Sequence, residues 1–179
     1  MVLWAGYGGR EEAYALLEAL VREKHGLDAC PPIARAERGK PWFPSCPVLC
    51  FNLSHSCGLL LCGAGETPLG VDIERIRPRQ ERLAQYVLSG AEYRWYTGRG
   101  SRQDDLYSLW TLKEARCKYT GAGLTLPPRT IAVPLLEPGE TGMLDGLYFR
   151  VYGDADWRAA VCALEEPPEE PTWSSVRSS

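Results

Sequence analysis

The sequence predicts a mixed fold in which helices pack with short antiparallel strands. Residues 11–24 repeat apolar side chains at helical spacing. Residues 104–119 begin with acidic residues and end in Lys118 and Gly121, as a helix does. Between these segments, residues 48–76 hold three short apolar runs separated by tight turns, a pattern typical of antiparallel strands.

The composition is that of a small folded protein. The chain has 179 residues, 45% of them hydrophobic, which suits one compact domain or two small lobes that share a core. Charged residues make up 24%, so the composition is not that of a disordered chain. The formal net charge of -3 argues against a general nucleic-acid binder, which normally carries a basic excess.

The N-terminal part predicts one strand and one helix. Residues 2–5 form a short apolar run that ends at two glycines. The helix over residues 11–24 is expected to stop at Gly26. The proline- and glycine-rich residues 31–41 are expected to be irregular.

Three strands are expected next, over residues 48–53, 59–62 and 69–76. The polar tripeptide Ser54-His55-Ser56 is interpreted as the turn after the first of them. Because the connections are short, the three strands are expected to form an antiparallel meander.

The second half predicts helices followed by strands. Ser89 and Glu92 have capping-box spacing, so a helix is expected to run to about Thr97, ahead of the helix over residues 104–119. Further strands are expected over three ranges, 130–133, 146–152 and 157–164. Residues 165–179 are rich in Pro, Glu and Ser and are expected to form a disordered tail.

Four of the seven cysteines lie close together around His55, so a zinc site has to be considered; they are Cys46, Cys50, Cys57 and Cys62. Their spacing does not match a paired zinc knuckle, and two of them lie inside apolar runs. Small buried thiols are the favoured interpretation.

The sequence predicts neither export nor membrane insertion. The first five residues are too short for the apolar part of a signal peptide and follow no cationic segment. No apolar run approaches the roughly 20 residues of a membrane span. A reducing cytoplasm is therefore the expected location.

Asp72 and Glu74 lie two residues apart on an expected strand, so they share one face while Val71 and Ile73 share the other. Two adjacent carboxylates repel each other, and a hard divalent cation is their preferred partner. A polar face on an edge strand is the alternative interpretation, and the pair alone favours it.

Trp110, Glu114 and Lys118 lie four residues apart and therefore share one face of an expected helix. Glu114 and Lys118 would also form an ordinary surface ion pair, which stabilises a helix by about 0.2–0.5 kcal/mol. Without further information that alternative is preferred.

Two short segments suit phosphate contacts. Ser54, His55 and Ser56 place hydroxyls and an imidazole in one turn, and Lys40 lies between a glycine and a proline. Either segment alone is also compatible with a solvated surface. The sequence contains no Walker loop, no GxGxxG and no GxSxG serine-hydrolase elbow.

The order of these motifs resembles the 4′-phosphopantetheinyl transferase superfamily. The resemblance covers residues 14–133 and rests on GKP at 39–41, FNLSHS at 51–56, GVDIE at 70–74 and WTLKEARCK at 110–118. GKP and FNLSHS indicate the longer, surfactin-synthetase-activating type rather than the short trimeric acyl-carrier-protein synthases.

The resemblance implies an α+β fold, a pseudo-dimer of two small lobes with antiparallel strands packed against helices. The transferase domain would span residues 1–164, with the lobe boundary near 66–76. Coenzyme A and Mg²⁺ would bind between the lobes, and one chain would act as a monomer.

Site residues follow from the resemblance motif by motif. Asp72, Glu74 and Glu114 would be the metal ligands, and Lys118 would contact the phosphates of coenzyme A. Lys40, Ser54 and His55 would line the nucleotide end of the site. Glu114 is the candidate base. Glu92 lies where the family has an acidic residue near the metal, but its capping role explains it equally well.

The implied reaction transfers the phosphopantetheine arm to a serine of an apo acyl or peptidyl carrier protein. Longer family members usually have more chain and more basic residues before the first helix, so the first lobe is expected to be reduced. Two alternatives remain open: a non-catalytic coenzyme A-binding protein, and a metal-dependent phosphoesterase that uses the same carboxylates.

Overall fold

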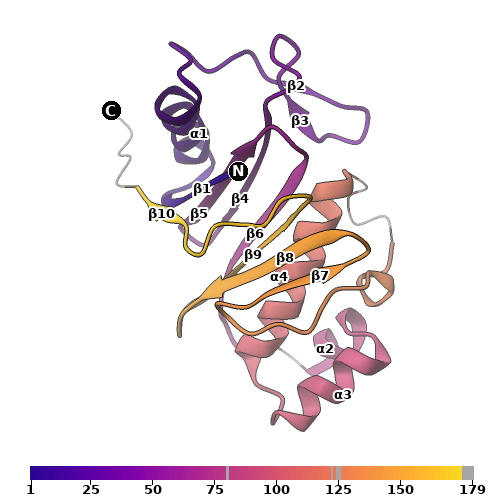
Figure 1. The fold of residues 1–179 in the computed structure, drawn as a ribbon. Helices are drawn as coiled ribbons and strands as arrows, with labels where there is room; N and C mark the ends of the chain where they lie inside the picture. The colour runs from indigo at the N-terminus through magenta and orange to yellow at the C-terminus, as the bar shows by residue number, and fades with distance from the viewer. Residues whose placement is uncertain (80, 122, 124–125, 175–179) are drawn as a thin grey trace.

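The structure, a computed structural model, describes residues 1–79, 81–121, 123 and 126–174. Two four-stranded sheets form its centre, with the strand orders β10-β1-β5-β4 and β6-β9-β8-β7. Helix α1 covers the first sheet and helix α4 covers the second (Figure 1). The α+β class is confirmed.

The first lobe is a strand–helix–hairpin unit. It contains β1 (Val2–Tyr7), α1 (Arg10–His25), β4 (Cys50–Ser56) and β5 (Leu59–Gly65). Strand β1 pairs antiparallel with β5, and β5 pairs antiparallel with β4.

The second lobe repeats this order. It contains β6 (Leu69–Arg75), α4 (Gln103–Thr120), β8 (Leu147–Gly153) and β9 (Trp157–Ala163). Strand β6 pairs antiparallel with β9, and β9 pairs antiparallel with β8. The two lobes therefore share one topology, and the chain passes from the first to the second at residues 66–68.

Shorter elements extend the two lobes. A two-stranded ribbon, β2 (Ala34–Arg35) and β3 (Pro41–Trp42), lies between α1 and β4 in the sequence. The second lobe adds α2 (Glu81–Val87), α3 (Gly90–Gly98), the 3₁₀ turn η1 (Pro128–Thr130) and β7 (Thr141–Leu144). Figure 1 shows α2 and α3 at the end of the molecule opposite the β2–β3 ribbon.

Three apolar clusters define the layers. One lies between α1 and the first sheet, and another joins α4 to β8, β9, α2 and α3. The third lies between the sheets, where Leu3 and Leu61 of the first lobe pack with Val71 and Ile73 of the second. The order of layers is helix, sheet, sheet, helix.

The helices predicted from local signals are confirmed. Helix α1 ends before Gly26 and α4 before Gly121, each a glycine in the left-handed conformation. The capping box at the start of α3 is present, with Ser89 and Glu92 in their reciprocal roles. No helix among the described residues is both long enough and apolar enough to cross a membrane.

The predicted turn at Ser54-His55-Ser56 is wrong. These residues continue β4, and the chain turns at Cys57 and Gly58, both with positive φ. A two-residue turn of this kind matches the twist of the strands it joins.

The predicted three-stranded meander is also wrong. Strand β6 leaves the first sheet and takes its backbone partner from β9, 157–163, because the second lobe builds its own sheet. This pairing partner lies far along the chain, so short connections did not reveal it.

Two further predictions are corrected. Residues 130–133 are not a strand, since η1 ends at Thr130 and the segment that follows pairs with no strand. Residues 165–174, expected in the disordered tail, are placed: β10 (Thr172–Trp173) pairs parallel with β1, and Glu165 forms an ion pair with the N-terminal amine. Residues 175–179 of that prediction lie outside the described residues.

Gly70 allows α4 to lie directly on β6. A Cβ at this position would overlap the α4 backbone at Ala115 and Tyr119. Backbone atoms cannot move aside as a flexible side chain can, so the close approach of helix and strand requires glycine here.

We expect Gly70→Ala to destabilise the protein by at least about 1–3 kcal/mol, the usual cost of overpacking, because α4 must move off β6. Denaturant unfolding measures the change. Gly98→Ala is the matched control, since a Cβ there meets no atom within 4 Å. Equal stability of the two variants would contradict the packing argument.

Candidate functional site

Asp72 is held by one residue from each side of the lobe boundary. Its side chain is buried, and Oδ1 accepts hydrogen bonds from Ser54 Oγ at 2.8 Å and from Lys118 Nζ at 2.7 Å. Ser54 belongs to β4 of the first lobe, whereas Lys118 lies near the end of α4. Two predicted site residues, Asp72 and Lys118, are therefore in direct contact.

Ser54 is buried, and its hydroxyl group makes three contacts. It donates to Asp72 and accepts from Lys118 Nζ at 2.9 Å and from the backbone N–H of Ile73 at 3.4 Å. One donor and two lone pairs are all that a serine hydroxyl has. Ser54 thus links β4, β6 and α4 at a single point.

Glu74 lies two residues further along β6, on the same face as Asp72. Its Oε2 accepts a 2.6 Å hydrogen bond from Ser56 Oγ, the next side chain but one on β4. Burial and the nearby charge of Asp72 raise the pKa of Glu74, although the hydrogen bond from Ser56 acts in the opposite direction.

Glu114 completes the acidic group from the side of α4. Burial, followed by the charge of Asp72, raises the pKa of Glu114 to about 7, while Lys118 acts in the opposite direction and Glu74 adds to the increase. Asp72 and Glu74 are therefore close enough to Glu114 for their charges to raise its pKa.

The chemistry of this group suits a hard cation. All the donors are carboxylate oxygens, which Mg²⁺ prefers. Asp72 Oδ2 is buried and has no hydrogen-bond partner among the described residues, which is costly for a carboxylate unless a ligand completes it.

The side chains do not form a complete metal cage as they stand. Within the described ranges, no three His, Cys, Asp or Glu side chains form a group that could hold a metal ion. The residues fit a cation in charge and donor type, and the assignment of Asp72, Glu74 and Glu114 as its ligands stays a prediction.

The clustered cysteines of the described chain do not form a zinc site either. Cys62 is buried, Cys46 and Cys50 are half-buried and Cys57 is exposed at the turn. The buried-thiol interpretation therefore holds for Cys62, and it does not hold for Cys57.

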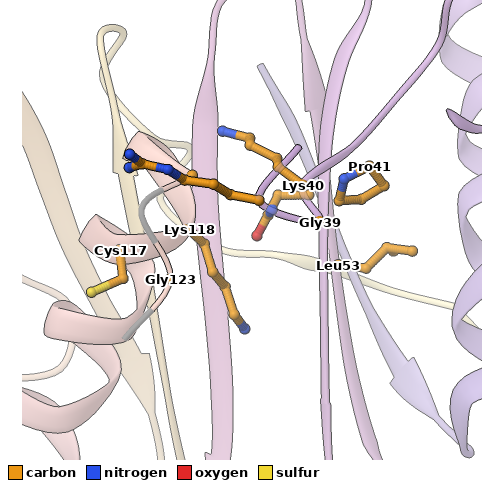
Figure 2. Close-up of a pocket in the computed structure, with 10 residues that line it drawn as sticks. Gly39, Lys40, Pro41, Leu53, Cys117, Lys118 and Gly123 are labelled. Carbon is orange, nitrogen blue, oxygen red and sulfur yellow. The ribbon is translucent and has the colours of Figure 1, made fainter. Parts of the chain in front are cut away.

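A cavity of about 220 Å³ lies between the lobes (Figure 2). Lys40, Asn52 and Leu53 line it from the first lobe, and Cys117 and Lys118 line it from α4. Arg38 adds a third cation, and no Asp or Glu is among the described residues of its wall. The cavity therefore favours an anionic ligand.

Lys40 connects this cavity to the end of α4. Its Nζ donates a 2.6 Å hydrogen bond to the carbonyl of Tyr119, and burial lowers the pKa of Lys40. A cation at the carboxyl end of a helix also interacts favourably with the helix dipole. Lys40 thus has a structural role in addition to its place in the cavity wall.

His55 is exposed on β4 and is not among the residues that line this cavity. As successive side chains on a strand point to opposite faces, His55 faces away from Ser54 and Ser56. Lys40 and Lys118 therefore line the cavity, whereas Ser54 contacts Lys118 without being part of the wall and His55 lies outside it.

Glu92 pairs with a lysine next to the site. Lys113 is only 1% exposed, and its Nζ donates to Glu92 Oε1 at 2.8 Å and to the carbonyl of Ile131. Glu92 also caps α3 through its other oxygen. The buried ion pair connects α3 to α4 at the residue before Glu114. The cap itself confirms the capping interpretation of Glu92.

Trp110 lies one turn before Glu114 and is half-buried. It lines a second, smaller cavity of about 150 Å³ with Glu74, Arg79 and Tyr107. Arg79 is held there by a 2.9 Å hydrogen bond from its Nε to Tyr107 Oη. Glu74 therefore borders this second cavity, while Lys118, the partner of Asp72, borders the first.

The roles of Asn52 and Ser56 in connecting β4 to β6 were not predicted from the sequence. Asn52, Ser54 and Ser56 alternate along β4, and each contacts β6 through its side chain. The signal was present as a polar residue at every second position after Phe51, but the turn assigned to residues 54–56 concealed it.

The pKa of Glu114 predicts a pH effect on stability. Because the folded state raises this pKa from its usual 4.5 to about 7, the folded protein binds the proton more tightly than the unfolded chain does. Stability without added metal should therefore fall as the pH rises from roughly 5 to 7.5.

Thermal unfolding at several pH values tests this expectation. Glu114→Gln should flatten the decline, because the amide does not titrate. An unchanged slope in Glu114→Gln would show that Glu114 is not the group responsible.

Several known proteins are similar to this chain in sequence. A sequence model of the 4′-phosphopantetheinyl transferase superfamily matches residues 68–162. A 4′-phosphopantetheinyl transferase of Bacillus subtilis is 33% identical over 157 residues, which cover 83% of this chain and 70% of that protein. The 4′-phosphopantetheinyl transferase Sfp of Bacillus subtilis strain 168 is 30% identical over 170 residues, 89% of this chain and 76% of Sfp.

A further relative and one solved structure extend the comparison. The 4′-phosphopantetheinyl transferase AcpT of Escherichia coli K12 is 39% identical over 124 residues, 65% of this chain and 62% of AcpT. The crystal structure of Thermotoga maritima holo-[acyl-carrier-protein] synthase aligns with 20% identity over 56% of this chain and 64% of that chain; its TM-score of 0.42 is too low to support an argument. On the family match and the two Bacillus relatives, this chain belongs to the 4′-phosphopantetheinyl transferase superfamily.

Proposed function

We propose that this chain transfers the 4′-phosphopantetheine arm of coenzyme A to a serine of an apo acyl or peptidyl carrier protein. The observation that carries the proposal, beyond family membership, is the position of Lys118. It lies in the wall of the cation-lined cavity and also contacts the buried carboxylate of Asp72. One residue thus joins an anion-binding cavity to an acidic group suited to a cation.

Coenzyme A would bind across the lobe boundary. Its phosphates require cations, which Lys40 and Lys118 supply from the two lobes, and Arg38 adds a third. The cavity of about 220 Å³ is smaller than typical sites for drug-sized ligands, about 300–1,000 Å³, so it would hold only one end of coenzyme A. Ser54 and His55 remain proposed contacts at the nucleotide end.

Asp72, Glu74 and Glu114 are the proposed ligands of Mg²⁺. When bound, this ion would neutralise charge on the pyrophosphate oxygens. The unpartnered Oδ2 of Asp72 supports this assignment. Lys118 already supplies one positive charge to the carboxylate group, and it is positioned to share that charge with a phosphate.

The proposed reaction is a displacement at the β-phosphorus. The serine oxygen of the carrier forms the new bond, the pyrophosphate bond breaks, and 3′,5′-ADP leaves. Lys118 stabilises negative charge that develops on the phosphate oxygens. Glu114 is positioned on α4 to accept the serine proton.

The setting of this activity is part of the proposal. We assign to the transferase domain residues 1–164 together with the following segment through β10, which pairs with β1, and we assign the reaction to the cytoplasm. Since both lobes of the repeat are supplied by one chain, we propose a monomer that needs no nucleic acid or membrane.

The proposal is tested by incubating the purified chain with apo carrier protein, coenzyme A and Mg²⁺. Mass spectrometry should show the carrier gaining one phosphopantetheine group. If several acyl and peptidyl carriers gain no mass while coenzyme A still binds, the chain is a non-catalytic binding protein. Release of phosphate from simple esters would instead indicate a phosphoesterase.

Glu114→Gln should abolish this transfer while leaving the fold intact, because the amide is a poor proton acceptor and a neutral ligand. Initial rates and circular dichroism measure the two effects. Glu18→Gln is the matched control, as Glu18 is an exposed glutamate of α1, and it should transfer at the unmodified rate. Near-normal turnover of Glu114→Gln would rule out the proposed role of Glu114.

A further inference from the structure

The edges of the two sheets meet at β4 and β6 without a backbone ladder between them. Strand β4 is the last strand of the first sheet, and β6 is the first strand of the second. Side chains of β4 make the connection instead: Asn52 Oδ1 accepts from the N–H of Val71 at 3.0 Å, and Ser54 Oγ accepts from the N–H of Ile73.

Two serine side chains of β4 contact carboxylates of β6. Ser54 donates to Asp72, and Ser56 donates to Glu74. Both pairs are spaced by two residues, so the serines share one side of β4 and the acids share one face of β6. Each of these two serines therefore donates a hydrogen bond to one acidic side chain of the second lobe.

These hydrogen bonds distinguish the two oxygens of a carboxylate. Ser54 and Lys118 both engage Oδ1 of Asp72, whereas Oδ2 has no partner among the described residues. An unrestrained carboxylate can rotate and exchange its oxygens, but the Ser54 contact selects one orientation. Hydrogen bonds of this kind to metal ligands typically change metal affinity by about 10–100-fold when removed.

The alternative is that the serines only join the lobes. A buried hydrogen bond contributes to stability wherever it lies. Asn52 separates the two explanations, because it makes the same kind of link to β6 but contacts a backbone N–H rather than a carboxylate.

We propose that Ser54 and Ser56 of the first lobe are positioning residues that orient Asp72 and Glu74 of the second lobe to bind a divalent cation. This inference rests on the proposed function. If the serines position the carboxylates, the cation site depends on correct docking of the two lobes. This holds although none of the proposed ligands of the cation comes from the first lobe.

The test measures Mn²⁺ binding to the full chain by the electron paramagnetic resonance signal of the free ion, with thermal unfolding recorded on each sample. We expect Ser54→Ala and Ser56→Ala each to weaken Mn²⁺ binding by about 10-fold or more. Ser56→Thr keeps the hydroxyl of the half-buried residue and should restore binding. Asn52→Ala should lower the unfolding temperature but leave the Mn²⁺ affinity unchanged.

Unchanged affinity in both folded serine variants would overturn the inference, and so would an equal loss in Asn52→Ala. Should Ser54→Ala fail to fold, Ser56→Ala and Ser56→Thr decide the question. Failure of the proposed function has a different signature, in which the unmodified chain neither binds Mn²⁺ nor modifies a carrier. If the unmodified chain modifies a carrier normally and the serine variants bind Mn²⁺ with normal affinity, only the positioning role is refuted.

Discussion

The close contact of α4 with β6 is the constraint on which the rest of the site depends. Gly70 has no side chain, so the helix backbone at Ala115 and Tyr119 lies directly on the strand. Asp72 shares the face of β6 that Gly70 presents to the helix. Lys118 therefore reaches Asp72 across this contact at 2.7 Å. A side chain at position 70 would separate the strand and helix that carry the proposed ligands.

The acidic residues of the site outnumber the cations that contact them, and this excess of negative charge favours binding of a cation. Glu92 and Lys113 neutralise each other in the core, where they fix α3 to α4. Lys118 is the cation in direct contact with Asp72, while Glu74 and Glu114 both have raised pKa values. A carboxylate group with this excess of negative charge favours binding of a further cation.

The two lobes are alike in topology but contribute differently to the site. The second lobe supplies all three proposed ligands, on β6 and α4. The first supplies Lys40 to the cavity and the serines of β4 to the carboxylates. The C-terminal segment links both lobes, since β10 pairs with β1 while Tyr152 Oη of β8 donates to the carbonyl of Pro168. The proposed site therefore draws residues from both copies of the repeated unit.

The sequence by itself determined the features that depend on near neighbours. The alternation of Val71, Asp72, Ile73 and Glu74, the capping box of Ser89 and Glu92, and the glycine after α4 are local, because strand period and helix ends act over a few residues. The ordered motifs also indicated the family, which the comparisons confirmed.

Only the tertiary structure decided the strand partner of β6, the continuation of β4 through residues 54–56 and the pairing of β10 with β1. Each involves segments distant in sequence, and backbone hydrogen bonding in a strand does not specify its partner. The serine contacts to Asp72 and Glu74 could not be predicted from the sequence for the same reason. The edges of two sheets have to meet before those side chains can face each other.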